Sequence, residues 1–149
     1  MLAFPMADQI EGRCLCGAVK IQLEAPAGWV GVCHCRMCQR WSGSLWAGFP
    51  ADHETITVTG PVRRYRSSQL AERAFCETCG SHLWMRDHKE GAPYDLMPGL
   101  FDESRTWPLQ GEIYVDEAMA SMAMAGQHRR ATAAEYRAKN PETEGVSDE

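Results

Sequence analysis

The chain has 149 residues, a formal net charge of −5, 44% hydrophobic residues and seven cysteines. This length corresponds to one ordinary domain, and no apolar run approaches the roughly 18 residues of a transmembrane helix. Because seven is odd, the cysteines cannot all be paired in disulfides. The first eight residues lack the basic and long apolar parts of a secretory signal, so we expect a cytoplasmic protein. In that compartment, grouped cysteines indicate metal binding or catalysis.

Charge is distributed unevenly along the chain. The segment 33–89 carries eight Lys and Arg against five Asp and Glu, a net of +3 that leaves −8 for the rest. One interpretation is a solvated basic strand face around Arg63–Arg66, and the other is a weak attraction for a small anion near the middle cysteines. A duplex nucleic acid is disfavoured as a partner, because the whole chain is acidic and no segment resembles a groove-reading helix. No membrane partner is expected, and the oligomeric state is left open.

Short strand-like segments follow one another along most of the chain, separated by Gly, Pro and Asp. No amphipathic helix of 10–15 residues separates them, which argues against a parallel sheet built from βαβ units. The pattern predicts a single all-β (β-rich) domain. The expected strands are Ala18–Leu23, Trp29–Cys33, Leu45–Phe49, Glu54–Thr59, Val62–Ser67, Arg73–Cys76, His82–Arg86, Tyr94–Met97 and Glu112–Val115.

The C-terminal part has a different composition. Met119–Met124 is rich in methionine, and we interpret it as adaptable packing against the sheet rather than as a ligand-binding surface. Thr132 and Glu135 form a capping-box pattern, which predicts a short helix over Ala133–Asn140 that ends before the next proline. The acidic end, Glu142–Glu149, is expected to be disordered.

Four of the cysteines form two similar pairs, each followed at once by glycine. A tight turn aims both sulfurs of a pair at one point, and glycine supplies the positive φ that such turns often need. Two pairs give the four ligands of tetrahedral Zn²⁺, which would clamp distant parts of the chain together and leave it poorly folded without metal. Iron or an iron–sulfur cluster is a chemical alternative, and reduced buried thiols are the plain one. The two pairs are Cys14 with Cys16, and Cys76 with Cys79.

The other three cysteines, Cys33, Cys35 and Cys38, lie within six residues. This spacing lets a strand end and a first helical turn bring three sulfurs together without a fourth. Catalytic zinc sites keep three protein ligands and one open position, so we expect an open site. Alternatives are a distant histidine that completes the coordination, or a redox-active cysteine pair without metal. His34 lies between two ligands and should point away from them, and the sequence identifies no catalytic residue.

These motifs resemble the glutathione-dependent formaldehyde-activating enzyme family, which also includes centromere protein V. The resemblance covers about residues 11–117, which we take as one domain, with 118–149 as a C-terminal extension. The motifs that carry it are Gly12-x-Cys14-x-Cys16-Gly17, Cys33-His34-Cys35-x-x-Cys38, Arg73-x-Phe75-Cys76-x-x-Cys79-Gly80 and Glu112-Ile113-Tyr114-Val115.

The resemblance implies a zinc-stabilised β-tent fold with two zinc ions. It assigns Cys14, Cys16, Cys76 and Cys79 to a structural site, and Cys33, Cys35 and Cys38 to a second, catalytic or labile one. It implies a carbon–sulfur lyase that reversibly joins glutathione to formaldehyde as S-hydroxymethylglutathione.

Two departures from the family pattern bear on the substrate rather than on the metal sites. Gln39 stands where many relatives carry a basic residue, and the tryptophan often found after the Ile-Tyr-Val strand is missing. Arg36, Arg40 and Arg64 are candidates for pairing with the carboxylates of glutathione, or are ordinary surface arginines. Another thiol or aldehyde therefore remains open as substrate. The alternative functions are a non-catalytic zinc-stabilised binding module, and metal buffering or thiol redox sensing.

Overall fold

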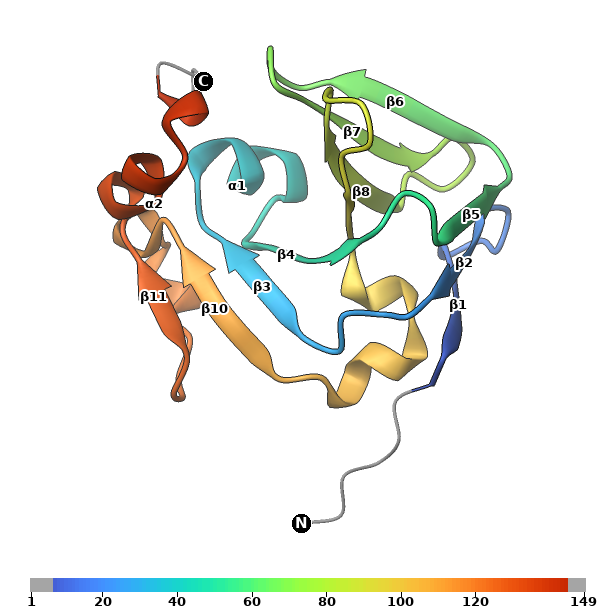
Figure 1. The fold of residues 1–149 in the computed structure, drawn as a ribbon, viewed down its shortest axis with the longest axis horizontal. Coiled ribbons are helices and arrows are strands. Elements are labelled where there is room, and N and C mark those ends of the chain that lie inside the picture. The colour runs from blue at the N-terminus through green and yellow to red at the C-terminus, as the bar shows by residue number, and fades with distance from the viewer. Residues whose placement is uncertain (1–6, 145–149) are drawn as a thin grey trace.

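The computed structural model describes residues 7–144 as two β-sheets with two short helices (Figure 1). The smaller sheet has the antiparallel order β1-β2-β5, formed by β1 (Gln9–Arg13), β2 (Lys20–Glu24) and β5 (Ile56–Thr59). Buried and exposed residues alternate strictly along β1 and β2. Successive side chains of a strand point to opposite faces, so each of these strands buries one face and exposes the other.

The larger sheet has eight strands in the order β11-β10-β3-β4-β9-β8-β7-β6. Most neighbours are antiparallel, but β10 is parallel to both β3 and β11. The strands are β3 (Val30–Cys33), β4 (Trp46–Ala51), β6 (Val62–Arg66), β7 (Ala71–Cys76), β8 (His82–Asp87), β9 (Tyr94–Leu96), β10 (Leu109–Ile113) and β11 (Arg129–Ala131).

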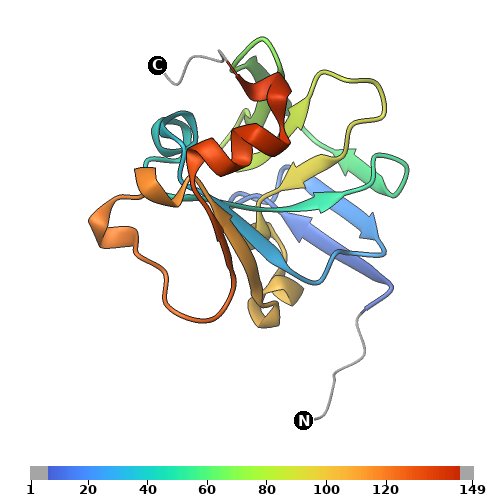
Figure 2. The same cartoon turned by 60° about the vertical axis from the view of Figure 1, so that its left-hand side comes forward.

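The two helices are α1 (Arg36–Ser42) and α2 (Ala133–Lys139), and both views place them at the same end of the molecule (Figures 1 and 2). Five 3-10 turns occupy Pro98–Leu100, Asp102–Thr106, Val115–Glu117, Ala120–Met122 and Pro141–Thr143. Among residues 7–144, no helix is both long and apolar enough to cross a bilayer.

The main core combines side chains from both sheets. Ile21 and Leu23 of the small sheet share one cluster with Phe49, Leu83 and Trp84 of the large one. A second, smaller cluster lies under the helices and is formed by Cys33, Cys38, Trp46, Tyr114 and Ala133. Burial of apolar surface therefore stabilises the contact of the two sheets and, separately, the end of the molecule that carries the helices.

The prediction of a single β-rich domain with a short C-terminal helix is confirmed. Thr132 caps α2 as expected, its Oγ1 accepting a hydrogen bond of 3.2 Å from the Glu135 amide. Each expected strand overlaps an observed one, whereas β1 and β11 were missed. The last expected strand, Glu112–Val115, ends early because Tyr114 has φ +57°, in the left-handed region, and a 3-10 turn follows.

Two other expectations need correction. The acidic end was expected to be disordered from residue 142, but a 3-10 turn covers Pro141–Thr143, while residues 145–149 lie outside the described part. Nor did the sequence pattern predict the parallel pairing of β10, which joins β3 through a long excursion of the chain and not through a single crossover helix.

Candidate metal centres and the cavity beside them

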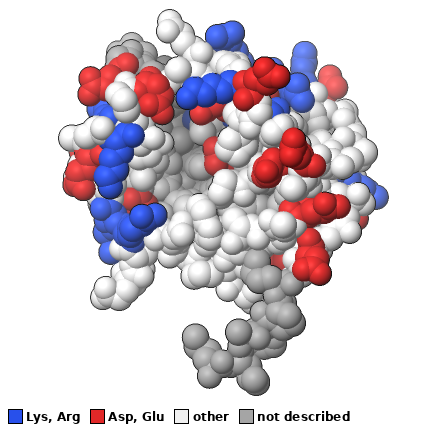
Figure 3. Space-filling view, in the orientation of Figure 1, with Lys and Arg blue, Asp and Glu red and all other residues white. Residues whose placement is uncertain are grey.

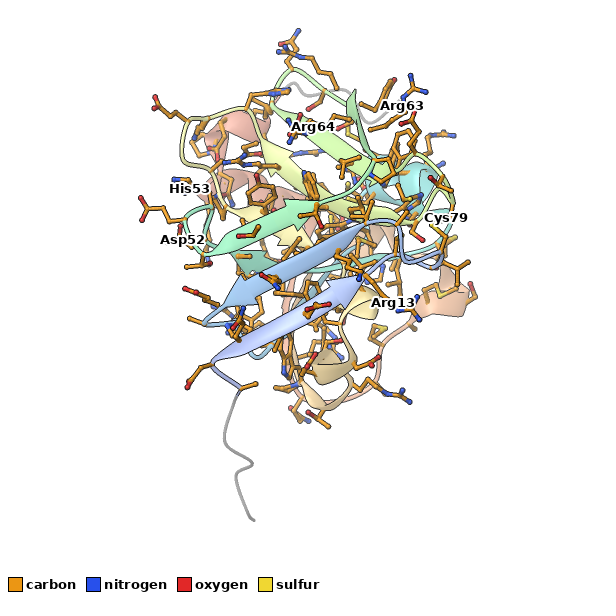
Figure 4. All side chains as sticks on the ribbon, turned by 90° about the vertical axis from the view of Figure 1, so that its right-hand side faces the viewer. Arg13, Asp52, His53, Arg63, Arg64 and Cys79 are labelled. Carbon is orange, nitrogen blue, oxygen red and sulfur yellow. The ribbon has the colours of Figure 1, made fainter. Side chains whose placement is uncertain are left out.

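The first cysteine group joins the two sheets. Cys14 and Cys16 lie in the turn between β1 and β2, and Cys76 and Cys79 lie at the end of β7 and in the turn after it. In each turn the amide of the following glycine, which has positive φ, donates to the carbonyl of the first cysteine. Figure 4 shows Cys79 at the same end of the molecule as Arg13, just before the other turn. The two motifs therefore meet although 60 residues separate them.

The four sulfurs have the spacing that a tetrahedral metal ion requires. All four lie within 4.8 Å of one another, with Cys14 Sγ–Cys16 Sγ at 3.6 Å and Cys16 Sγ–Cys76 Sγ at 3.9 Å. Four ligands at the usual Zn–S length of about 2.3 Å would be about 3.8 Å apart. The Val19 amide donates to Cys14 Sγ at 3.3 Å, and Ser81 Oγ lies 3.2 Å from Cys79 Sγ. These contacts stabilise thiolates, so the donor set fits a metal ion such as Zn²⁺.

The second group, Cys33, Cys35 and Cys38, forms at the junction of β3 and α1. Cys33 ends the strand, Cys35 is the N-cap of the helix, and Cys38 lies in its first turn. The Cys38 amide donates to Cys35 Sγ at 3.3 Å, and all three sulfurs lie within 4.8 Å of one another. No histidine, carboxylate or fourth cysteine of residues 7–144 joins them. The donor set can therefore hold a metal ion with an incomplete protein shell.

The charged residue Arg73 contacts this group, and the sequence reasoning gave it no role. It projects from β7, is 2% exposed, and its Nη2 lies 3.5 Å from Cys38 Sγ. Hydrogen bonds from Cys33 and Cys35 lower the pKa of Cys38, and the Arg73 charge lowers it further, to about 3. The other two guanidinium nitrogens, Nε and Nη1, are buried without a hydrogen-bond partner among the described residues. Only the Arg-x-Phe-Cys motif could have indicated this residue.

A cavity of about 550 Å³ opens beside the three cysteines. This volume is typical of pockets for small ligands. Cys33, Cys35 and Cys38 line it, β7 and β8 form its floor, and Tyr114 and Tyr136, which pack in the same cluster as Cys33, complete the lining. Figure 3 shows a hollow on this face, between the side that carries α2 and the side that carries β6 to β8. The walls are mainly apolar, and the cavity is open to solvent on one side.

Asp95, on β9, is a second charged residue of this cavity that the sequence reasoning did not identify. No hydrogen bond or ion pair is formed by its carboxylate within the described chain. Burial, followed by the charge of Asp87, raises the pKa of Asp95 from 3.8 to about 6. A carboxylate without a partner in a mainly apolar wall is costly for stability, which is typical of a group that contacts a ligand.

His34 points away from the sulfurs, as expected. Its Nε2 lies 2.6 Å from Glu112 Oε1, and His128 Nε2 lies 2.5 Å from Glu112 Oε2. Arg130 Nε is 3.3 Å from the same carboxylate. Burial would raise the pKa of Glu112, but the hydrogen bonds from His128 and His34 outweigh it and the pKa is lowered. Both histidines thus belong to an internal ion-pair network and not to the three-cysteine group.

Arg36, Arg40 and Arg64, proposed from the sequence as partners for carboxylates, do not line the cavity. Arg64, on β6, lies over the Trp84 ring and 3.8 Å from Glu72 of β7. Figure 4 shows Arg64 near Arg63, its neighbour on β6. The basic segment around residues 63–66 therefore lies on an edge strand and outside the cavity lining, and Arg63 lies 4.0 Å from Glu77, beside Cys76 of the first cysteine group.

Gln39 and the methionine-rich segment Met119–Met124 also lie outside the cavity lining. The Gln39 side chain donates to the carbonyls of His34 and Glu117, which explains why it does not reach a ligand. In the segment Met119–Met124, Met119 is exposed and Met122 contacts Ser44, so the segment does not cover the cavity.

Together these features define a cysteine-rich β domain with one closed and one open group of metal-ligating thiols, the open one facing a cavity. A family model described as glutathione-dependent formaldehyde-activating enzyme matches residues 9–117. The chain belongs to this family.

Individual relatives agree with the family match. An uncharacterised lyase of Schizosaccharomyces pombe is 27% identical over 73% of this chain and 80% of its own length. A Halomonas elongata protein whose name assigns it to the glutathione-dependent formaldehyde-activating enzymes is 30% identical, over 52% of this chain and 56% of its own length. A crystal structure of a Rhodobacter sphaeroides protein matches with a TM-score of 0.52 and 22% identity, over 68% of this chain and all of that one, which supports the fold alone.

Proposed function

We propose that the protein is a zinc-dependent carbon–sulfur lyase that reversibly adds a small thiol, such as glutathione, to formaldehyde or another small aldehyde. The observation that carries the proposal is the open three-cysteine group that faces a cavity of about 550 Å³. The family match and the lyase among the relatives support the same reaction class. We place the protein in a reducing compartment such as the cytoplasm, because its seven cysteines are free thiols grouped as ligands.

In the proposed reaction, the thiol loses its proton and its sulfur forms a bond to the aldehyde carbon. The electron pair of the C=O bond moves to the oxygen, which takes up a proton to give the hydroxymethyl thioether. Zn²⁺ bound by Cys33, Cys35 and Cys38 would supply a position at which the substrate sulfur is held as a thiolate. Hydrogen bonds from Cys33 and Cys35, together with the Arg73 charge, favour the ionised form of Cys38. The largely apolar cavity wall would reduce the amount of water around the reacting groups.

The assignment of roles rests on the closed and open donor sets. Cys14, Cys16, Cys76 and Cys79 would hold a structural zinc, because four thiolates leave no position for a ligand. Cys33, Cys35 and Cys38 would hold the second zinc, whose protein shell is incomplete. A non-catalytic binding module would also explain the closed site, but it gives no reason for an open group of thiols beside a cavity.

The test is exchange NMR of a formaldehyde and glutathione mixture with and without the zinc-loaded protein. We expect faster exchange at micromolar protein, and loss of the acceleration in Cys35→Ser. Metal analysis should give two zinc ions per chain, and one in the folded Cys35→Ser variant. Exchange that the protein does not accelerate, with glutathione or with other small thiols and aldehydes, would contradict the lyase and leave the binding module.

A further inference from the structure

Two charged side chains without partners face the same cavity. Arg73 is 2% exposed, with Nε and Nη1 unbonded among the described residues. Asp95 is half-buried, and its carboxylate forms no hydrogen bond or ion pair with the described residues. Burial of a polar group without a hydrogen bond is unfavourable, so each of the two residues calls for a ligand group of opposite charge. The existing contact of Arg73 with Cys38 uses only Nη2.

The strand register fixes how these two side chains are related. Arg73 on β7 pairs with Met85 on β8, and Met85 pairs with Asp95 on β9. Directly paired residues of neighbouring strands point to the same face of a sheet. Arg73, Met85 and Asp95 therefore form one row across the cavity floor, with an apolar side chain between the two charges. Since strands lie about 4.8 Å apart, the outer two Cα atoms are separated by about 10 Å.

The two ends of the row, Asp95 and Arg73, have different charged surroundings. On the β9 side, Asp87 lies two residues after Met85 and so on the same face, and its charge adds to the effect of burial that raises the pKa of Asp95 to about 6. A cation would relieve both effects there. On the β7 side, the guanidinium lies next to the three cysteines, where an anion would satisfy its free N–H groups. Lys89 and Glu142 also line the cavity.

We propose that this row recognises a thiol that carries a zwitterionic α-amino-acid group, with the carboxylate at Arg73 and the ammonium at Asp95. The inference rests on the proposed function and names the substrate class of the same site. One carbon that carries both an ammonium and a carboxylate presents opposite charges to the two ends of the row, each through a charge-assisted hydrogen bond. Two small-thiol sources have this chemistry: cysteine itself, and the γ-glutamyl end of glutathione.

The test is calorimetric binding to the zinc-loaded full chain of four small thiols that carry both charged groups, one of them or neither: cysteine, cysteamine, 3-mercaptopropionate and 2-mercaptoethanol. Glutathione is added as a fifth. Because the thiols differ in acidity, the quantity compared is the change in each Kd between the parent protein and a variant. In Asp95→Asn we expect the Kd of cysteine and cysteamine, or that of glutathione, to rise about tenfold. The Kd of 3-mercaptopropionate and 2-mercaptoethanol should change less than about twofold.

The variant Arg73→Gln tests the other end of the row. Since Arg73 also contacts Cys38, the quantity read is the ratio of the 3-mercaptopropionate and 2-mercaptoethanol Kd values within this one variant. We expect the ratio to shift by about tenfold against the carboxylate-bearing thiol. Asp8→Asn, at an exposed position just before β1 of the small sheet, is the matched control and should leave every Kd unchanged.

The outcomes separate this inference from the proposed function. A rise for cysteine and cysteamine without glutathione identifies the free amino acid as the ligand, and a rise confined to glutathione identifies its γ-glutamyl end. Equal changes for all five thiols in Asp95→Asn would overturn the zwitterion inference while leaving thiol binding intact. If no thiol binds, and none changes the visible spectrum of the cobalt-substituted protein, both the inference and the proposed function are wrong.

Discussion

At the scale of single residues, two charged side chains in the cavity wall lower the stability of the folded protein. Arg73 and Asp95 both occupy positions in central strands of a sheet, where an apolar residue would pack without cost. Arg73 is partly compensated by Cys38 and by the Trp41 ring, whose centre lies 5.9 Å from the guanidinium carbon. Asp95 has no such compensation. Destabilising groups of this kind concentrate at functional sites.

This predicts an unusual pH dependence for Asp95. Its folded pKa of about 6 lies above the ordinary value of 3.8, so folding favours the protonated form. Its contribution is therefore most favourable below about pH 4 and is lost as the pH rises through 6. Asp95→Asn removes this loss and should be more stable than the parent at pH 8 by about 1–3 kcal/mol.

Urea unfolding of the zinc-loaded proteins at several pH values between 5 and 8 measures the effect. The advantage of Asp95→Asn should shrink as the pH falls toward 5, whereas the control Asp8→Asn should follow the parent throughout. An asparagine variant less stable than the parent at pH 8 would show that the Asp95 carboxylate has a favourable partner.

At the scale of elements, one buried carboxylate ties together the strands next to the second cysteine group. Glu112 of β10 contacts His34, which follows β3, and His128, which precedes β11. These are the parallel pairs of the sheet, β10 with β3 and β10 with β11. Because His34 lies between two of the cysteines, the network also fixes the start of α1. The element boundary that carries the ligands is thus held from the side opposite to the cavity.

We predict that Glu112→Gln lowers the free energy of unfolding by about 1–3 kcal/mol at pH 7, because a neutral amide with one acceptor oxygen replaces a carboxylate that both histidines and Arg130 contact. The folded pKa of Glu112 is lowered from 4.5, so its stabilisation is present above that pH and is lost as the pH falls through the folded value. The deficit of the variant should therefore shrink in acid.

Chemical unfolding of parent and variant at pH 7 and at pH 4 is the measurement. Glu103→Gln, at an exposed position of the Asp102–Thr106 turn, is the matched control and should cost nothing measurable. Equal stabilities of parent and Glu112→Gln at pH 7 would mean that the network does not hold these strands together.

At the scale of the whole molecule, the four-cysteine group lies where the two sheets meet. It links the β1–β2 turn of the small sheet to the end of β7 in the large one. Structural zinc contributes roughly 10–16 kcal/mol of binding free energy, as much as or more than the ~5–15 kcal/mol net stability of a domain. The three-cysteine group, in contrast, is local to β3 and α1 and closes no long loop.

The two groups should therefore respond differently to mutation. We expect Cys76→Ser to abolish cooperative unfolding, because it removes a ligand that joins the sheets, and Cys35→Ser to retain a folded chain. Circular dichroism melts, together with metal analysis, check this. Stringent chelation should reproduce the Cys76→Ser result in the parent protein. Sharp unfolding of the fully demetallated protein would contradict a structural role for the metal.

Local sequence determined much of this protein. The Cys-Gly turns, the Cys33–Cys38 spacing, the strands and the Thr132 cap follow from interactions between residues a few positions apart, which short patterns record. The pattern failed where the determinant was distant. β1 and β11 are short and polar at their exposed positions, and β11 is defined by its parallel pairing with β10.

Only the tertiary structure decided what the cavity can recognise. Arg73 and Asp95 are 22 positions apart in the sequence; Arg73 belongs to the Arg-x-Phe-Cys motif, which assigns it no role, and Asp95 belongs to no motif. The register of β7, β8 and β9 places them in one row, and the register depends on which faces of all three strands are buried. The seven cysteines divide into four and three in the sequence. The structure adds that the three cysteines line one cavity together with the Arg73 guanidinium and the Asp95 carboxylate. Strand pairing brings these side chains together, and the spacing of residues along the chain does not record strand pairing.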